Sequence, residues 1–243
     1  MLPELILKEE RLDNFALLFI LGVASSFVGI LAAVTLFPSE ASVLSVVFAS
    51  IPLVYPLATK FLEAENSDED SYVEELKIYG ALFVGETFGF TLLSLFRPDI
   101  LTLQAEVAGI SGMATQSGLF MSIFTNNMLV FSGILAVSAI VGSAGAFILV
   151  WNASVLGKFF GVLLSHLDGI EVITGNAKSA SPIAYVPHAT LEMTGFILAG
   201  ISGSLISAAV YREHFDRETW GDIVKLIIIG SICIYFGAAL ESA

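Results

Sequence analysis

Long apolar runs, separated by short polar segments, constrain the fold of this chain more than any other feature. Residues 15–37, 78–96, 187–211 and 223–240 each come close to the ~20 apolar residues that a helix needs to cross a bilayer. Backbone groups inside lipid must bond within their own element, so such runs form helices. We therefore expect an all-α fold, a polytopic bundle of transmembrane helices.

The composition supports a membrane protein and argues against several other classes. Charged residues make up only 14% of the 243 residues, whereas soluble domains carry about 25%. The net charge is -13, but most acidic residues fall between the apolar runs, and we expect no nucleic-acid partner. A single cysteine, Cys233, excludes an intramolecular disulfide and a cysteine-based metal site. The lipid bilayer is the first partner predicted.

Seven candidate spans follow from the pattern. They are residues 15–37, 41–62, 78–96, 117–152, 153–166, 187–211 and 223–240. The first run is too long for a signal-peptide core and is expected to be retained. Pro52 and Pro56 are expected to bend or loosen the second, because a proline inside a helix removes a backbone donor.

The fourth and fifth runs leave the number of spans open. Residues 117–152 exceed one bilayer thickness, so residues 117–127 are expected at the interface, with the span itself ending at Asn152. Residues 153–166 are shorter and include Lys158. If they cross, the protein has about seven spans; if they only re-enter, it has six.

The connecting segments predict the orientation. Residues 63–77 contain seven acids and one lysine, and should form a solvated loop with a short helix at its end. Residues 97–116 should form an external loop or a surface-lying helix. With seven crossings, most Lys and Arg residues share one side with the N-terminus, which places the N-terminus and residues 63–77 in the cytoplasm. We treat residues 1–243 as a single multi-pass domain of the cell membrane, with residues 1–116 preceding a helical core of residues 117–243.

A few polar residues lie at membrane depth, where they are costly. Glu86 lies between Gly85 and Gly89, a small-xxx-small spacing that allows close helix contact, and should face protein or water. Asn126 and Asn127 precede the predicted fourth span, where asparagine caps a helix or bonds to a neighbouring helix.

A proline, a histidine and a carboxylate open the apolar stretch of residues 186–203. Pro187 suits the first turn of a helix, and His188 and Glu192 share one helix face. They could form a structural hydrogen-bonded pair, a proton relay or a docking point, and the sequence leaves these open. Asn152 is expected to terminate its span.

No motif supports catalysis, a metal or a cofactor. H-E-x-x-H, the phosphate-binding glycine loops and G-x-S-x-G are all missing from the sequence. We therefore predict no enzyme activity, no catalytic residue, no metal site and no cofactor.

The order of the polar motifs resembles the stage II sporulation protein M family. The motifs are T-N-N at residues 125–127, W-N at 151–152, P-H-A-T-L-E at 187–192 and A-A-L-E ending at Glu241. The resemblance covers residue 117 to the end. In that family the pattern is N-N, then N-G, then P-H-G-x-x-E-L; here Ala153, Ala189 and Met193 stand at the differing positions.

The resemblance implies a membrane scaffold, since the best-known member recruits a peptidoglycan hydrolase and its partner during engulfment in spore formers. The leading hypothesis is a scaffold or assembly factor in cell-envelope remodelling. It would contact protein partners through the cytoplasmic residues 63–77 and form a homodimer through small-xxx-small faces. The alternative is a channel or transporter for a small solute or ion. Its cavity would be lined by Glu86, Asn126, Asn127, His188 and Glu192.

Overall fold

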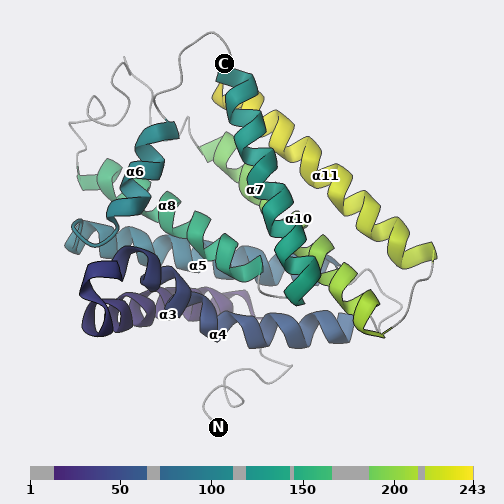
Figure 1. The fold of residues 1–243 in the computed structure, drawn as a ribbon, viewed down its shortest axis with the longest axis horizontal. Coiled ribbons are helices and arrows are strands. Elements are labelled where there is room, and N and C mark those ends of the chain that lie inside the picture. The colour runs from purple at the N-terminus through teal and green to yellow at the C-terminus, as the bar shows by residue number, and fades with distance from the viewer. Residues whose placement is uncertain are drawn as a thin grey trace. The chain divides into compact units, whose positions relative to one another are not determined.

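The computed structural model describes residues 14–64, 72–111, 119–142, 145–165, 186–212 and 217–242, and within these ranges it contains helices and no strands. The helices are α3 (Phe15–Leu36), α4 (Ala41–Ala64), α5 (Tyr72–Phe96), α6 (Thr102–Ser111), α7 (Leu119–Val141), α8 (Gly145–Ser165), α10 (Val186–Arg212) and α11 (Arg217–Glu241), with a short 3₁₀ turn η1 (Pro38–Glu40) between α3 and α4 (Figure 1). The all-α prediction is confirmed.

Five of the described helices are long and apolar enough to cross a membrane. They are Phe15–Leu36, Lys77–Phe96, Leu119–Val141, Pro187–Tyr211 and Thr219–Glu241. Two shorter apolar helices, Pro38–Val54 and Ala146–Val162, occupy the remaining predicted runs. The polytopic bundle is therefore confirmed, while crossing by the two shorter helices stays a prediction.

The boundary between the fourth and fifth runs was predicted wrongly. α7 ends at Val141, Gly142 has a φ of 65°, and α8 begins at Gly145. A left-handed residue after the last helical residue ends a helix, and glycine adopts it without a steric penalty. The run of residues 117–152 therefore consists of two helices, and Asn152 lies inside α8 instead of terminating a span. Residues 153–166 are therefore not a separate span, and Lys158 lies within α8.

Three other segments differ from their predicted limits. The fourth span, expected to begin after Asn127, begins as a helix at Leu119. α5 begins at Tyr72, so the short helix expected at the end of residues 63–77 is the start of the third span; residues 65–71 lie outside the described residues. α4 continues to Ala64, two residues past its predicted end, and includes Pro52 and Pro56, where the bend stays a prediction.

α6 lies within residues 97–116, which were expected to form an external loop or a surface-lying helix. α6 is tied to the start of α4 by Gln104, whose Oε1 accepts a hydrogen bond from Ser42 Oγ at 2.6 Å and whose Nε2 donates to Ser42 O at 2.8 Å. At ten residues, α6 is about 15 Å long, half the thickness of the hydrocarbon core. We therefore do not count it as a span.

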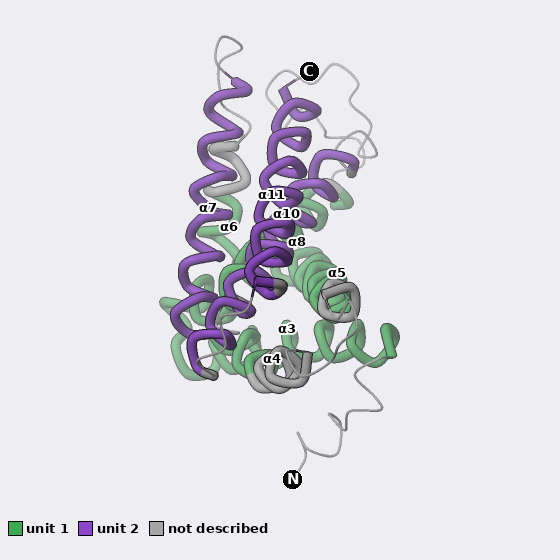
Figure 2. Tube along the Cα trace, turned by 90° about the vertical axis from the view of Figure 1, so that its right-hand side faces the viewer, with its two compact units in different colours: residues 1–56, 77–113, 147–178 green, residues 57–76, 114–146, 179–243 purple. Residues whose placement is uncertain are grey.

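The chain divides into two compact units (Figure 2). Unit 1 comprises residues 1–56, 77–113 and 147–178, and unit 2 comprises residues 57–76, 114–146 and 179–243. Among the described helices, unit 1 holds α3, α6 and most of α4, α5 and α8. Unit 2 holds α7, α10 and α11. Each unit thus combines segments that are far apart in the sequence.

Small residues bring the helices of unit 1 into close contact. A Cβ atom on Gly22 of α3 would lie 2.6 Å from the Leu82 carbonyl oxygen of α5, and Gly89 of α5 packs directly on Ser26. A Cβ atom on Gly157 of α8 would lie 2.6 Å from Phe90 Cβ of α5. The small-xxx-small face of α5 is therefore filled by α3 of the same chain.

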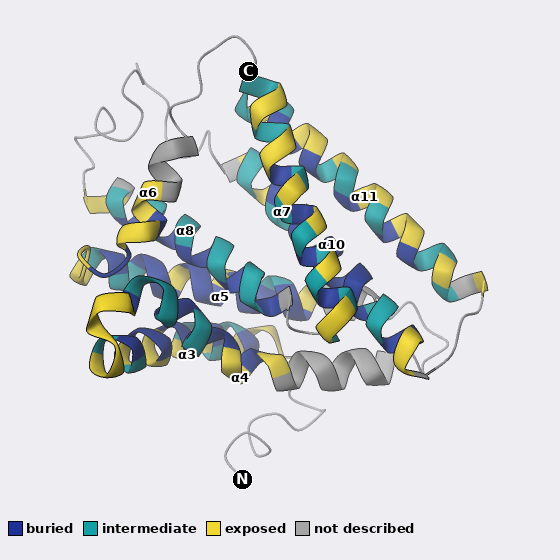
Figure 3. Ribbon diagram, viewed as in Figure 1, coloured by how far each residue is buried: buried dark blue, intermediate teal, exposed yellow. Residues whose placement is uncertain are grey.

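In unit 2, α10 contacts both α7 and α11 and is the most buried of the three (Figure 3). Gly203 packs against Leu135 and Ser138 of α7, and Gly195 packs against Ile234 of α11. Apolar side chains are exposed on the outer faces of α7 and α11, namely Met121, Leu129, Ile140, Ile228, Ile232 and Phe236. Such extended apolar surfaces suit contact with lipid.

Candidate functional site

A hydrogen bond between two buried side chains links α7 to α10 in unit 2. Asn127 Nδ2 donates to Glu192 Oε1 at 2.5 Å. The residues are 9% and 8% exposed, and both lie inside long apolar helices. A hydrogen bond to a charged or acidic partner within an apolar bundle is among the stronger helix-to-helix contacts available there.

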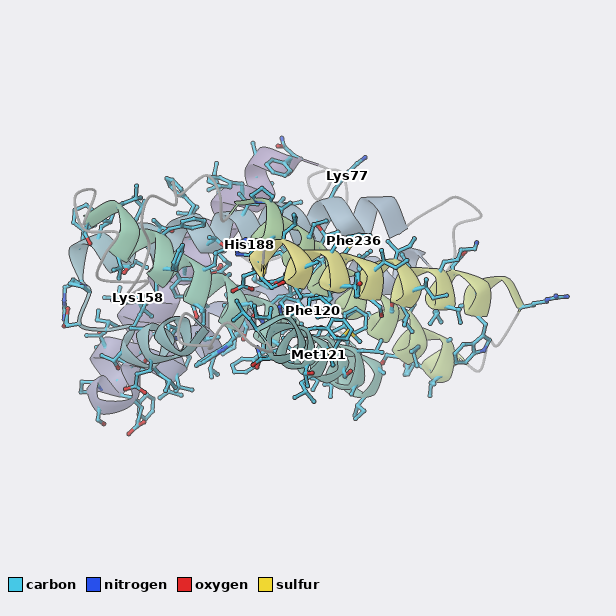
Figure 4. The ribbon with its side chains drawn as sticks, turned by 90° about the horizontal axis from the view of Figure 1, so that it is seen from above. Lys77, Phe120, Met121, Lys158, His188 and Phe236 are labelled. Carbon is cyan, nitrogen blue, oxygen red and sulfur yellow. The ribbon has the colours of Figure 1, made fainter. Side chains whose placement is uncertain are left out.

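The third helix of the unit, α11, completes the surroundings of Glu192. Gly237 lies against α10, where an added Cβ atom would be 2.6 Å from Glu192 Cγ and 3.3 Å from the carbonyl oxygen of His188. Glu241, one turn beyond Gly237, interacts electrostatically with Glu192. His188 lies one turn before Glu192 on α10 and is partly buried; Figure 4 marks its position. One amide, one imidazole and two carboxyl groups therefore occupy this end of unit 2.

A second buried carboxyl group lies in unit 1. Glu86 of α5 is 1% exposed, and its Oε1 accepts a hydrogen bond from Ser25 Oγ of α3 at 2.6 Å. Within the described part of the chain, its Oε2 has no hydrogen-bond partner. A buried polar atom without a partner costs about 1–3 kcal/mol, so this oxygen calls for an explanation.

A buried lysine stabilises the turn after α5. Lys158 of α8 is 4% exposed, and its Nζ donates to the carbonyl oxygen of Pro98 at 2.8 Å. In the same turn, Arg97 and Asp99 form an exposed salt bridge of 2.8 Å. The hydrogen bonds that Arg97 donates to Asp99 lower the pKa of Asp99 and raise the pKa of Arg97. The hydrogen bond from Lys158 to Pro98 thus attaches the start of the α5–α6 connection to α8.

The sequence matches the family model of stage II sporulation protein M over residues 15–243. The chain belongs to the stage II sporulation protein M family. No curated protein and no solved structure matches it. The match includes α3, α4 and α5, so the family region is wider than the residues after 117 on which the motif resemblance was based.

The structure brings together some of the predicted site residues and separates others. Asn127, His188, Glu192 and Glu241 lie in one unit and around one carboxyl group. Pro187 is the second residue of α10 and is exposed, in the first turn as expected. Glu86 and Asn152 belong to unit 1.

The capping interpretation of the two asparagines is wrong. α7 begins at Leu119, about two turns before them, because the apolar residues from 119 onward continue the helix. Asn126 is exposed, whereas Asn127 follows the other interpretation and bonds to a neighbouring helix. Asn152 donates to the carbonyl oxygen of Ile148 in its own helix at 2.8 Å.

Two residues of the buried polar contacts were missed by the sequence analysis. Ser25 was not singled out, although the consecutive serines Ser25 and Ser26 interrupt the most apolar span. Lys158 was noted only as a charge in an uncertain span. Its contact with Pro98 was not foreseeable, because the partner lies 60 positions away in the sequence.

No group of three His, Cys, Asp or Glu side chains that could hold a metal ion occurs among the described residues. His166 and His214 lie outside them.

Proposed function

We propose that this protein is a multi-pass scaffold of the cell membrane that holds partner proteins in place during cell-envelope remodelling. Membership of the stage II sporulation protein M family and the exposed apolar helix faces support this role. The carrying observation is the use of buried polar groups in bonds between helices: Asn127 to Glu192 and Ser25 to Glu86. Hydrogen bonds of this kind between membrane helices help to fix one helix arrangement, which a scaffold requires.

The proposed orientation has a cytoplasmic N-terminus and seven crossings. Lys158 lies inside α8 and is not counted for either side. The basic residues on the cytoplasmic side are then Lys8, Arg11, Lys60, Lys77, Arg212, Arg217 and Lys225, and those on the other side are Arg97 and Lys178. This bias supports the orientation. It places residues 65–71, the most acidic part of the chain, where cytoplasmic partners can bind.

Self-association is also part of the proposal. The Gly85 and Gly89 face is filled by α3, so it is not available for a homodimer. On α7, Ser132 and Ala136 are exposed, and Gly133 has open space beside it. We place the homodimer contact on this face.

Affinity purification from native membranes in a gentle detergent tests the scaffold role. Neutralising Asp68, Glu69 and Asp70 should remove the cytoplasmic partners while leaving the protein folded. Neutralising Glu40, Asp99 and Glu106, which are exposed acids elsewhere, is the charge-matched control. Recovery of the protein alone, with no partner in the unmodified sample, would refute the proposal.

Transport of protons or small cations is a second candidate. It is favoured by Glu86 Oε2, which has no described partner, and by the proximity of Glu192 to Glu241. Ionisable groups inside a membrane often mark ion pathways. Purified protein in vesicles under an imposed gradient should then show flux that is lost in Glu86→Gln, His188→Ala and Glu192→Gln. Flux equal to that of empty vesicles would exclude this candidate.

A further inference from the structure

Two helices of the chain share a short stretch of sequence. α3 contains F-V-G-I-L-A at residues 27–32, and α7 contains F-S-G-I-L-A at residues 131–136, so five of six residues agree at a shift of 104. The isoleucine of each stretch, Ile30 or Ile134, is buried.

The same shift relates the next pair of helices. α4 contains V-V-F-A-S-I at residues 46–51, and α8 contains V-W-N-A-S-V at residues 150–155. The helix starts agree as well: α3 begins at Phe15 and α7 at Leu119, and α4 begins at Ala41 and α8 at Gly145. A single shift therefore fits two helices and the turn between them.

The matched residues of α4 and α8 have the same structural environment. The valine and alanine of each stretch, Val46 and Ala49 or Val150 and Ala153, are buried. Ser50 Oγ donates to the carbonyl oxygen three residues earlier at 2.8 Å, and Ser154 Oγ does the same at 2.7 Å. The sequence match thus extends to burial and hydrogen bonding.

The third helices share a motif with an acid. α5 has E-T-F-G-F at residues 86–90, and α10 has E-M-T-G-F at residues 192–196, a shift of 106. Glu86 and Glu192 are both buried, as are Phe90 and Phe196. Each glutamate accepts one hydrogen bond from the matching first helix: from Ser25 of α3 in one case and from Asn127 of α7 in the other.

The first and third helices also run in the same direction in both sets. Along α3 and α5, the contacts of Gly22 with Leu82 and of Ser26 with Gly89 advance together. Along α7 and α10, the contact of Asn127 with Glu192 is followed by that of Ser138 with Gly203. Parallel first and third helices require the second helix of each set to cross in the opposite direction.

We infer that residues 15–96 and 119–212 are two copies of one three-helix repeat with opposite orientations in the membrane, and that Glu86 and Glu192 are two copies of one proton-binding carboxyl site. The opposite orientation follows from three crossings per copy, because α6 is too short to add a fourth. Inverted repeats of this kind recur in transporters, whose substrate and ion sites lie near the middle of the bilayer between the repeats.

The surroundings of the two carboxyl groups suit a proton. Glu86 Oε2 is buried without a donor among the described residues, and Glu86 Oε1 accepts from the uncharged hydroxyl of Ser25. Glu192 has Asn127 on α7, Glu241 on α11 and His188 one turn away on α10. A carboxylate in such apolar surroundings is costly, and a proton removes that cost. This inference depends on neither candidate function, since both require only that the helices lie in the membrane.

Cysteine labelling tests the opposite orientation. In a Cys233→Ser background, Ser39→Cys and Ser143→Cys occupy matching positions of the two copies, at the same shift of 104. A membrane-impermeant maleimide should label them from opposite sides of the membrane, and both should react after detergent is added. Labelling of both from the same side would overturn the inference.

Modification by a membrane-soluble carbodiimide tests the shared site, because this reagent attacks protonated carboxyl groups in apolar surroundings. Peptide mass spectrometry of the unmodified protein should find adducts on both Glu86 and Glu192, and none on the exposed Glu106. Glu86→Gln should lose only the first adduct, and Glu192→Gln only the second. An adduct on neither glutamate, or on one alone, would overturn the equivalence whatever the binding and flux experiments show.

Discussion

The hydrogen bond between Asn127 and Glu192 can be tested with a closely matched control, because the adjacent residue is also an asparagine. Asn127→Ala removes the amide that donates to Glu192 Oε1 and leaves that oxygen without its partner inside the bundle. Hydrogen bonds between membrane helices contribute about 0.6 kcal/mol on average and up to ~1.7. An unsatisfied buried acceptor costs about 1–3 kcal/mol. We expect Asn127→Ala to lower the free energy of unfolding by about 1–2 kcal/mol.

Asn126→Ala is the matched control, since Asn126 is exposed on the same helix. It removes the same side chain at the adjacent position and should change stability by less than about 0.5 kcal/mol. The assay is unfolding in mixed micelles by added denaturing detergent, followed by circular dichroism. A double-mutant cycle with Glu192→Ala should return a coupling of about 1 kcal/mol between positions 127 and 192.

Two results would refute this reasoning. Equal losses from Asn126→Ala and Asn127→Ala would mean that the cost comes from the helix itself and not from the bond. A coupling near zero in the double-mutant cycle would mean that the two side chains do not interact in the folded protein.

Three further predictions concern unit 1. Gly157→Ala should destabilise the protein by about 1–3 kcal/mol in the same assay, because its Cβ would lie 2.6 Å from Phe90 Cβ, while Gly80→Ala, with open space beside it, should be tolerated. Lys158→Met should cost about 1 kcal/mol through the lost bond to Pro98, compared with a smaller effect of Lys225→Met, whose exposed pair with Asp222 contributes little. The salt bridge with Arg97 keeps the pKa of Asp99 below its usual value. The small contribution of this pair to the stability of the fold is therefore complete above the usual aspartate pKa and is lost as the pH falls through the lowered value. Arg97→Gln should raise the pKa of Asp99, as measured by an NMR titration of its carboxyl carbon.

The sequence was sufficient to predict the membrane class and most helices, because each apolar run near bilayer length has only one stable form in lipid. It failed at Gly142, where no charged residue marks the end of a helix and one glycine in a run already rich in small residues provides the break. Hydropathy alone could not locate that break, so Asn152, predicted to end a span, lies inside α8.

Partners of the buried polar residues were less predictable than the helices. Glu86 and Ser25 are 61 positions apart, and Asn127 and Glu192 are 65 apart, so only the packing of the helices brings them together. A signal was nevertheless present: the stretches at 27–32 and 131–136 repeat with a fixed shift. Comparing the chain with itself would have matched α3 with α7 and α5 with α10, so that a helix contact known in one copy would have predicted its counterpart in the other.

The repeat also separates a structural role of the glutamates from a chemical one. A bond between helices needs only an acceptor, which glutamine supplies as well as glutamate. The two donors do not occupy matching positions, since Ser25 matches Leu129 at the shift of 104, whereas the acid is the same in both copies. If the hydrogen bond alone had been selected, donor and acceptor would have been free to change together. The element common to both copies is the carboxyl group. The scaffold role explains why the helices are hydrogen-bonded, but it does not explain why both bonds use an acid. If Glu86→Gln preserves stability, any change in proton binding that it causes comes from the loss of the acid alone.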